Sequence, residues 1–336
     1  MSSSNNDMMP TVSIIMPVYN GAKFLPRMID SIIAQSLPSW ELICIDDGST
    51  DNSVAILESY AAKDDRIQFV KQKNMGGCLA RNTGIARAKG EFVYICDQDD
   101  YVHPQAMEFL VWLFLRHDLD FISFYNKKFY TDEPPKVAPL GDFASIPVTI
   151  VEKGRECEDV KTSSHALASV QIDVWAQFTT RELAQKCPSI DTIDIARTFR
   201  LIQASHRWAF SPFEDLYHYY KSTGVTWSTR PLGADTIKAV HRNLVSLFEQ
   251  YSKCRSEGDR WNAWKTVRRG FMLKNLKMEL NGLKRRNKNQ PKAYQDEAWR
   301  ALAEEVRDLN SRGALSWREI KLRHAIKYLL LMLKYR

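Results

Sequence analysis

The sequence predicts an α/β protein: a mostly parallel sheet flanked by helices, followed by a C-terminal helical appendage. Apolar strand-like runs alternate with helical patterns through about the first 125 residues, and only helical signals follow after about Pro231. Strands that alternate with helices at this spacing are typical of βαβ units, in which helices cover the faces of a parallel sheet. With 336 residues and 44% hydrophobic content, the chain can bury a substantial core.

The expected strands and helices follow one another in a regular order. The strands are short apolar runs, whereas the helices carry apolar residues at helical spacing. The expected strands are 12–16, 42–45, 67–70, 92–96 and 121–124, and the expected helices are 24–34, 53–62, 79–88 and 105–116. Polar clusters follow three of the strands, at 17–21, 46–51 and 97–100. Because ligands of parallel sheets bind beyond the carboxyl ends of the strands, these clusters are expected to converge on one site.

Charge is distributed unevenly along the chain. From Arg230 onward, 25 Lys and Arg stand against 11 Asp and Glu, whereas the first 229 residues contain 22 against 29. An acidic pocket suits metal chemistry, and a basic tail suits an anionic surface such as a membrane leaflet or nucleic acid. The first residues lack the basic and apolar segments of a secretory signal, and the six cysteines form no CxxC pair. We therefore expect a cytoplasmic protein without disulfides or zinc.

The segment Asp97-Gln98-Asp99-Asp100 directly follows an apolar strand-like run. Carboxylates this close repel one another and raise one another's pKa, whereas a hard divalent cation such as Mg²⁺ or Mn²⁺ neutralises them through oxygen ligands. Such a cation keeps coordination positions free for phosphate, so the segment predicts a metal–diphosphate site. The alternative is an acidic turn that caps the helix beginning after Pro104.

The turn after the first strand contains no G-x-G-x-x-G motif and the chain has no P-loop, which argues against a dehydrogenase. Asp46 and Asp47 follow the second expected strand, where a carboxylate can accept a hydrogen bond from the N3–H of uracil. Tyr19 is expected to stack on the same base or to border it. The alternative for this cluster is a turn followed by a helix cap, which is the favoured interpretation of Gly48 and Ser49.

These residues are part of a longer pattern that resembles the family 2 glycosyltransferases, which have the GT-A fold. Over residues 12–125 the likeness is carried by SIIMPVYNGAKFLPRMIDSIIAQSLPSWELICIDDGSTDNS and NMGGCLARNTGIARAKGEFVYICDQDD. Two later blocks, VWAQFTTREL at 174–183 and FEDLY at 213–217, resemble the acceptor-side segment and the Glu-Asp motif of that family.

The resemblance implies a division of the chain into three parts. A disordered N-terminus at 1–10 precedes a GT-A domain at 11–230, and a basic helical region follows at 231–336. Within the domain, 11–125 is expected to bind the nucleotide sugar, and 126–230 is expected to form the acceptor side.

The resemblance also assigns donor-side roles to individual residues. It implies that Asp99 binds Mn²⁺ or Mg²⁺ directly and that Asp97 contacts the ribose or a metal-bound water, whereas Asp100 only caps the next helix. For Arg81, a contact with the nucleotide and a structural ion pair with an acidic loop are both open. The remaining residues match positions around the base: Pro17 and Tyr19 beneath it, and Asp46 and Asp47 at the uracil edge.

On the acceptor side, the resemblance implies that Asp215 is the general base of an inverting transfer, in which the acceptor hydroxyl attacks opposite the departing nucleoside diphosphate. In a helix at 213–222 adjacent side chains point about 100° apart, so Glu214 is expected to bind an acceptor hydroxyl or to orient the loop. On the same helix His218 shares a face with Asp215, as a metal ligand, a pH-tuned partner or a packing residue. Trp175 is expected to contact the acceptor, with core packing as the alternative.

Four helices are expected in the C-terminal region, at 236–251, 261–283, 293–309 and 317–335. In the last of these, Lys and Arg surround apolar residues at helical spacing, and the longest apolar run, 328–333, is too short to span a bilayer. Such a basic amphipathic helix is expected either to lie on an anionic membrane surface or to dock on its own domain or on a partner subunit.

The resemblance therefore implies an inverting, metal-dependent glycosyltransferase that moves a sugar from a nucleotide sugar, UDP-linked, to a glycan or lipid-linked glycan acceptor. We expect it to act in surface polysaccharide synthesis at the cytoplasmic face of the membrane. The alternative is a noncatalytic protein that binds a nucleotide sugar or a polyanion, but binding alone does not need Asp215. Nucleic acid is not the expected partner, and the oligomeric state is left open.

Overall fold

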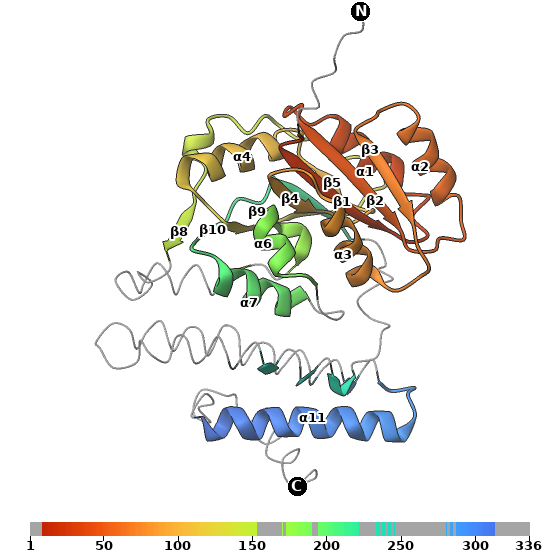
Figure 1. Ribbon diagram of the computed structural model, residues 1–336, viewed down its shortest axis with the longest axis vertical. Helices are drawn as coiled ribbons and strands as arrows, with labels where there is room; N and C mark the ends of the chain where they lie inside the picture. Colours follow the sequence, from red (N-terminus) through yellow and green to blue (C-terminus); the bar gives the residue numbers. More distant parts are fainter. Residues whose placement is uncertain are drawn as a thin grey trace, which may run out of the picture. The chain divides into compact units, whose positions relative to one another are not determined.

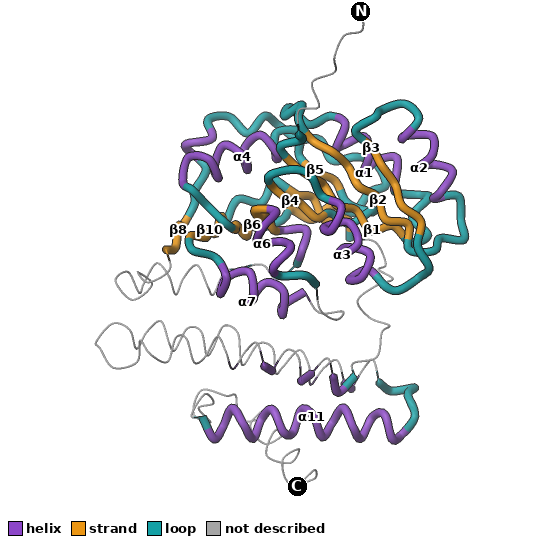
Figure 2. The backbone as a smooth tube through the Cα atoms, in the orientation of Figure 1, coloured by secondary structure: helices purple, strands orange, loops and turns teal. Residues whose placement is uncertain are grey.

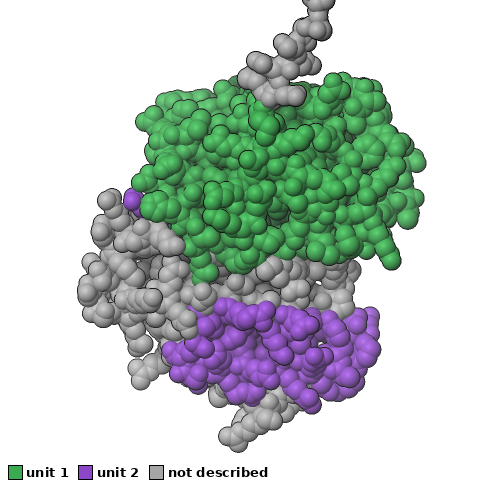
Figure 3. Space-filling model, in the orientation of Figure 1, with its two compact units in different colours: residues 1–150, 171–222 green, residues 151–170, 223–336 purple. Residues whose placement is uncertain are grey.

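The computed structural model describes residues 9–152, 170, 173–189 and 194–221, together with parts of 233–312. The chain divides into two compact units, one formed by residues 1–150 and 171–222 and the other by 151–170 and 223–336 (Figure 3). All of the residues expected in the active site belong to the first unit.

The first unit is built on an eight-stranded sheet with the strand order β3-β2-β1-β4-β9-β6-β10-β8. One half of this sheet consists of β1 (Val12–Val18), β2 (Trp40–Asp46), β3 (Ile67–Lys71) and β4 (Phe92–Ile95). These four strands are parallel, and β1 lies between β2 and β4. Parallel strands covered on both faces need apolar residues at successive positions, and every residue of β2 is buried. The strands expected in this region are confirmed.

The other half of the sheet comes from less regular sequence. β6 (Phe121–Phe124) is the fifth expected strand, and β10 (Arg207–Ser211) pairs with it in parallel. β9 (Gln177–Thr180) lies between β4 and β6 and runs antiparallel to both, and β8 (Thr149–Glu152) forms the edge. Because β9 pairs with β4, the segment that carries Trp175 lies beside the strand that leads into the acidic segment.

Three short strands form a second sheet in the order β5-β11-β7. They are β5 (Tyr101–Val102), β7 (Lys127–Phe129) and β11 (Tyr217–Tyr220). β11 runs antiparallel to β5 and parallel to β7. The helix expected at 213–222 is therefore wrong, because the aromatic sequence Tyr-His-Tyr-Tyr favours a strand and two neighbouring strands pair with it.

Helices cover both faces of the large sheet, as Figure 1 and Figure 2 show. Alternate residues of β1 point to opposite faces, so that Ile14 packs in one core and Ile15 in another. The four helices expected before residue 120 are confirmed. Among the described residues of this unit, the helices are α1 (Leu25–Ile33), α2 (Ser53–Ala61), α3 (Gly77–Arg87), α4 (Ala106–His117), α6 (Arg181–Lys186) and α7 (Asp194–Ala204), with short 3₁₀ turns at η1 (Phe143–Ser145) and η2 (Val174–Ala176).

The described part of the second unit contains one long helix, α11 (Lys292–Ser311). Its buried residues Ala298, Leu302 and Leu309 lie at helical spacing, which confirms the helix expected at 293–309. The helices expected at 236–251 and 261–283 lie largely outside the described residues, and the one expected at 317–335 lies wholly outside them. Within the described residues, no helix combines the length and the apolar character needed to cross a membrane.

α3 packs closely on β1 because residue 84 has no side chain. A Cβ atom on Gly84 would lie 2.3 Å from Cγ2 of Ile15, which is completely buried. We therefore expect Gly84→Ala to lower the free energy of unfolding by about 1–3 kcal/mol through overpacking. Gly77→Ala in the same helix is the matched control, because nothing lies within 4 Å of the Cβ position there. Urea denaturation measures both effects, and equal stability of the two variants would contradict the prediction.

Candidate active site

The loops that follow β1 and β2 are joined by hydrogen bonds at one edge of the sheet. Val18 lies beside Asp46 in the strand register, so the two loops begin at the same level. The backbone N–H of Asn20 donates to Oγ of Ser49 (3.0 Å), and Oδ1 of Asn20 accepts from the backbone N–H of Thr50 (2.8 Å). These two polar clusters therefore converge, as parallel strands that end at a common edge require.

The loop after β1 is also joined to the acidic segment, through the side chain of Gln98. Oε1 of Gln98 accepts from the backbone N–H of Tyr19 (2.9 Å), and Nε2 donates to the carbonyl oxygen of the same residue (3.0 Å). Gln98 was not expected in the site, because an amide between carboxylates is as common on a solvated turn as in a binding site. With this contact, hydrogen bonds connect all three polar clusters.

Asp100 does not cap a helix. The N-cap of α4 is Gln105, whereas Asp100 is completely buried beneath β11. Its Oδ1 accepts from the backbone N–H of Tyr220 (2.7 Å), and its Oδ2 accepts from the hydroxyl of Tyr217 (2.5 Å). Burial, together with the charges of the two neighbouring aspartates, raises the pKa of Asp100 well above its usual range. The expectation for Asp100 is therefore corrected: this side chain fastens the acidic segment to the small sheet.

Asp97 and Asp99 are the two half-buried carboxylates of the segment. Burial, and then the charge of Asp97, raise the pKa of Asp99 to about 6. A divalent cation beside these groups would favour their charged forms, and their hard oxygen atoms fit Mn²⁺ or Mg²⁺. In the part of the chain that the structure describes, no group of three or more His, Cys, Asp or Glu is arranged to hold a metal ion. Asp97 and Asp99 would therefore hold such an ion only together with ligands from outside this group of side chains.

Two arginines lie against the acidic segment. Nη2 of Arg81 lies 3.4 Å from Oδ1 of Asp97, so the ion pair with an acidic loop is present, while a contact between Arg81 and the nucleotide stays a prediction. Arg27 donates to the carbonyl oxygen of Asp99, and its guanidinium lies over the rings of Tyr220 (4.6 Å) and Phe129 (4.9 Å). Both arginines place positive charge where the carboxylates gather, which lowers their mutual repulsion.

Asp46 and Asp47 have different surroundings, although both are 3% exposed. Asp47 accepts from Nε2 of Gln72 (2.8 Å) and from the backbone N–H groups of Met75 (2.9 Å) and Gly76 (2.7 Å), and so orders the loop before α3. Asp46 accepts one long hydrogen bond, from the backbone N–H of Ser49 (3.3 Å). Both remain predicted base contacts, and Asp46 is the one with fewer partners inside the protein.

Pro17 and Tyr19 lie next to these carboxylates. Pro17 is half-buried in β1 and pairs with Ile45, whereas the side chain of Tyr19 is 48% exposed. The backbone of Tyr19 is held at both its N–H and its carbonyl oxygen by Gln98. An exposed aromatic ring on a fixed backbone can stack on a planar ligand, so the expected place of Tyr19 beneath the base is compatible with the structure.

Trp175 packs against the small sheet. Its ring stacks on those of Tyr217 (4.9 Å, 10° between the planes) and Tyr219 (5.3 Å, 15°), and the residue is 7% exposed. Packing is therefore the role that the structure shows for Trp175, and its contact with an acceptor sugar stays a prediction. Tyr217 also donates a hydrogen bond to Asp100, so this cluster of rings packs around a residue that holds the acidic segment.

Asp215 lies in the turn that precedes β11. Its side chain is 42% exposed, and its Oδ1 lies 2.8 Å from Nζ of Lys127 and 3.9 Å from Nε2 of His218. Burial lowers the pKa of His218 to about 4, so its imidazole is neutral near pH 7 and its Nε2–H donates to the carbonyl oxygen of Asp215 (3.2 Å). The predicted proximity of His218 and Asp215 is thus confirmed, but through a turn and a strand rather than along a helix.

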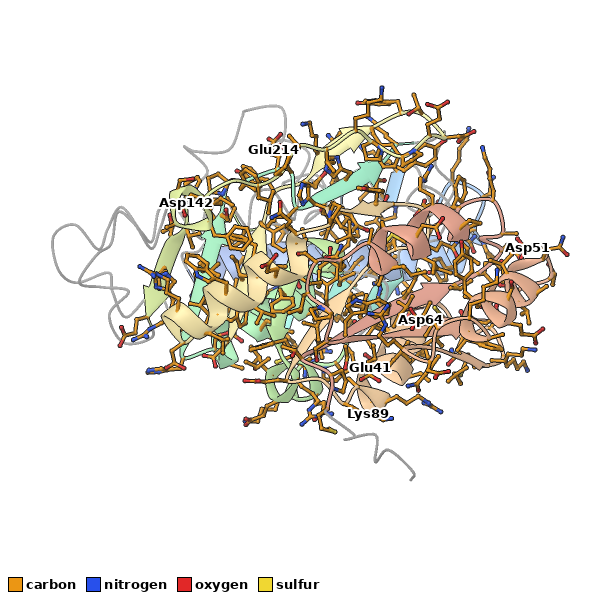
Figure 4. The ribbon with its side chains drawn as sticks, turned by 90° about the horizontal axis from the view of Figure 1, so that it is seen from above. Glu41, Asp51, Asp64, Lys89, Asp142 and Glu214 are labelled. Carbon is orange, nitrogen blue, oxygen red and sulfur yellow. The ribbon has the colours of Figure 1, made fainter. Side chains whose placement is uncertain are left out.

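Glu214 is exposed and lies on the same turn. In Figure 4 it lies on the opposite side of the unit from Glu41 and Lys89. Glu41 belongs to a buried network in which its Oε1 accepts from Oγ of Ser13 (2.6 Å) and from the backbone N–H of Lys89 (2.7 Å). That network satisfies a buried carboxylate within the fold, whereas Glu214 and Asp215 are accessible to a ligand.

The buried His218 makes folding depend on pH. Its pKa of about 4 in the folded protein lies below the value near 6.5 of an exposed imidazole, so the unfolded chain takes up the proton first as the pH falls. This part of the stability is present above pH 6.5 and is lost as the pH falls toward 4, by about 3 kcal/mol at most. We expect His218→Asn to reduce this loss, as measured by urea denaturation at pH 7 and pH 5. The control is His206→Asn at an exposed position, and an unchanged loss in His218→Asn would contradict the prediction.

Comparison with known proteins agrees with this architecture. Residues 13–157 match the family model described as Glycosyl transferase family 2. The sequence is similar to Glycosyltransferase GlyG of Streptococcus pneumoniae serotype 4, with 37% identity over 118 residues, which make up 34% of this chain and 39% of that protein. The match thus spans about two fifths of the length of this relative.

Two solved structures share the fold. The crystal structure of S. aureus TarS 1–349 in complex with UDP-GlcNAc has a TM-score of 0.65 at 18% identity, covering 92% of this chain and 82% of that one. The mannosyltransferase PcManGT from Pyrobaculum calidifontis, in complex with GDP-Man and Mn²⁺, has a TM-score of 0.50 at 15% identity, covering 98% and 81%. Residues 13–157 therefore resemble glycosyl transferase family 2, and the chain has the GT-A fold.

Proposed function

We propose that this protein is an inverting glycosyltransferase that moves a sugar from a UDP-linked donor to a hydroxyl group of a glycan or lipid-linked glycan, in the synthesis of a surface polysaccharide. The observation that carries the proposal is the hydrogen-bonded connection between the acidic segment and β11. The backbone N–H of Asp97 donates to the hydroxyl of Tyr217 (3.2 Å), and Asp100 binds the same strand. The donor-side carboxylates and Asp215, two residues before Tyr217, therefore belong to one connected structure.

The donor is proposed to lie across the loops that follow β1, β2 and β4. Tyr19 has an exposed ring that can stack on the base. Asp46 is proposed to accept a hydrogen bond from the N3–H of uracil, because within the described residues it accepts only one long hydrogen bond from the protein. Asp97 and Asp99 would hold Mn²⁺ or Mg²⁺, which when bound neutralises charge on the leaving diphosphate. The donors named for the two similar structures, UDP-GlcNAc and GDP-Man with Mn²⁺, support a nucleotide sugar and a divalent cation.

Asp215 is proposed to take the proton of the acceptor hydroxyl as the new bond to the anomeric carbon forms. Lys127 contacts Oδ1 of Asp215, and within the described part of the chain Oδ2 has no hydrogen-bond partner, so the acceptor hydroxyl can approach Oδ2. The neutral His218 donates a hydrogen bond to the backbone carbonyl oxygen of Asp215 and so helps to fix the position of the proposed base. Glu214, exposed on the same turn, is proposed to bind a second acceptor hydroxyl.

The basic C-terminal region is proposed to bring the enzyme to an anionic membrane surface, where a lipid-linked acceptor is presented. The excess of Lys and Arg after Arg230 supports this part of the proposal. A noncatalytic protein that binds nucleotide sugars or polyanions is the second candidate, because its binding site would need the same basic and acidic groups. The accessible Asp215 disfavours it, since binding alone does not require a base.

Calorimetric titration with UDP tests the donor site. We expect UDP to bind in the presence of Mn²⁺, and Asp99→Ala to weaken that binding by tenfold or more, because the variant removes a hard oxygen ligand. Asp142→Ala is the control, since this exposed carboxylate caps η1 and takes no part in the proposed site. Equal affinity with and without Mn²⁺, or in Asp99→Ala and the wild type, would contradict the metal assignment.

A second titration series, combined with turnover, tests the base. Asp215→Asn is expected to bind UDP within about twofold of the wild type but to lose about 10²- to 10⁴-fold in the rate of sugar transfer, because it no longer accepts a proton. Transfer is measured as UDP released from UDP-sugars in the presence of a panel of glycan acceptors, with Asp142→Asn as the control. Full turnover in Asp215→Asn would exclude this residue as the base, and no turnover in the wild type with any donor would favour the binding protein.

A further inference from the structure

We infer that Gln98 is a positioning residue that holds the base-binding loop and the diphosphate-binding carboxylates at a fixed separation, so that both ends of the donor bind at once. The inference rests on the proposed function, because it concerns the donor site proposed above. It adds a residue to that site for which neither the charge pattern nor the family pattern gave a reason.

The geometry of the contact is unusually specific for a surface side chain. One amide makes two hydrogen bonds to the backbone of one residue, accepting from the N–H of Tyr19 (2.9 Å) and donating to its carbonyl oxygen (3.0 Å). An amide presents a donor and an acceptor side by side, and this is the pairing that a neighbouring strand would provide. The contact therefore fixes the orientation of the Tyr19 backbone as well as its position.

Gln98 is well placed to couple two parts of a ligand site because of its neighbours in the sequence. Asp97 and Asp99, the proposed metal-binding carboxylates, lie on either side of it, and its partner Tyr19 carries the ring proposed to stack on the base. The two segments are 79 residues apart in the chain. A shift of Gln98 relative to Tyr19 would thus change the distance between the two halves of the donor site.

Gly21 makes room for this amide. A Cβ atom at residue 21 would lie 2.3 Å from Oε1 and 2.5 Å from Cδ of Gln98, much closer than real side chains approach one another. The backbone of Gly21 is held by Oγ of Ser53, to which its N–H donates (2.8 Å). Residue 21 is therefore fixed beside the amide, and even a methyl group there would displace Gln98 from Tyr19.

Other contacts hold each of the two segments separately. The acidic segment is fastened by Asp100 to β11 and by the carbonyl oxygen of Asp99 to Arg27. The loop after β1 is fastened by Asn20 to the loop after β2. β1 and β4, which lead into the two segments, also pair with each other. Loss of the Gln98 amide is therefore expected to leave both segments folded and to remove the side-chain link between the two loops, which separates a positioning role from a structural one.

The expected consequence follows from effective concentration. When two parts of one ligand bind to sites at a fixed separation, the second contact forms within the complex and strengthens binding without any new interaction. Removal of the link should weaken the binding of UDP, which spans both parts. It should leave unchanged the affinity of ligands that occupy only one part. Uridine probes the base-binding loop alone, and inorganic pyrophosphate with Mn²⁺ probes the carboxylates alone.

The experiment compares the wild type with Gln98→Met, which keeps the length of the side chain and removes both hydrogen bonds. Calorimetry with UDP, uridine and pyrophosphate, each with Mn²⁺, should show UDP affinity lowered by roughly tenfold or more and the other two affinities within about twofold. Hydrogen exchange at the Tyr19 amide, measured without ligand, should become faster in Gln98→Met. Unchanged UDP affinity, a parallel loss for all three ligands, or unchanged exchange at Tyr19 would overturn the inference.

The failure of the proposed function has a different signature. If the wild type binds no UDP, the UDP assignment fails, and the ligand coupling fails with it, whatever the exchange rate at Tyr19. If the wild type binds UDP and Gln98→Met binds it equally well, the donor site stands and the role of Gln98 is excluded.

Gly21→Ala provides an independent route to the same link. This variant should lose UDP affinity as Gln98→Met does, because the new methyl group collides with the amide. Combined with Gln98→Ala, which removes the colliding group, Gly21→Ala should cost no further affinity, so the two substitutions are expected to be non-additive. Gly77→Ala is the control, as its Cβ meets open space. Additive losses would overturn the inference.

Discussion

The arrangement of the site depends on the buried carboxylate of Asp100 and the two hydrogen bonds that it accepts from β11. A completely buried carboxylate has to be satisfied inside the protein, and the Tyr217 hydroxyl and the Tyr220 amide do so. The acidic segment is therefore fixed to the small sheet at the strand that follows Asp215. The same contact orders the Trp175 ring, which stacks on Tyr217.

The cost of this arrangement is electrostatic. Three aspartates within four residues repel one another, and burial raises the pKa values of Asp99 and Asp100 further. Arg81 pairs with Asp97. Arg27 donates to the backbone of Asp99, and its guanidinium lies over aromatic rings. These contacts hold the repelling groups in place without occupying all of the carboxylate oxygens. A divalent cation would reduce the repulsion that remains, which is the physical reason why such a segment suits the cation proposed above.

The parts of the fold with strong local patterns could be predicted from the sequence. β1 to β4, β6 and the helices α1 to α4 follow apolar patterns that the sequence alone displays. The strands β7, β9, β10 and β11 could not be predicted, since polar residues interrupt their apolar patterns and pairing with distant partners stabilises them. The error at 213–222 has this origin: a pattern compatible with a helix becomes a strand when β5 and β7 lie beside it.

By itself, the sequence determined the α/β class, the order of the N-terminal elements and the gathering of acidic residues at strand ends. These features follow from hydrophobic periodicity and from the common direction of parallel strands. Only the tertiary structure decided what each acidic or polar side chain does there. Asp100 is buried and holds the acidic segment to β11. Asp47 orders the loop before α3, and Gln98 links the acidic segment to Tyr19. The reason is physical: the role of a polar group depends on its burial and its partners, and those partners come from residues 25 to 120 positions away.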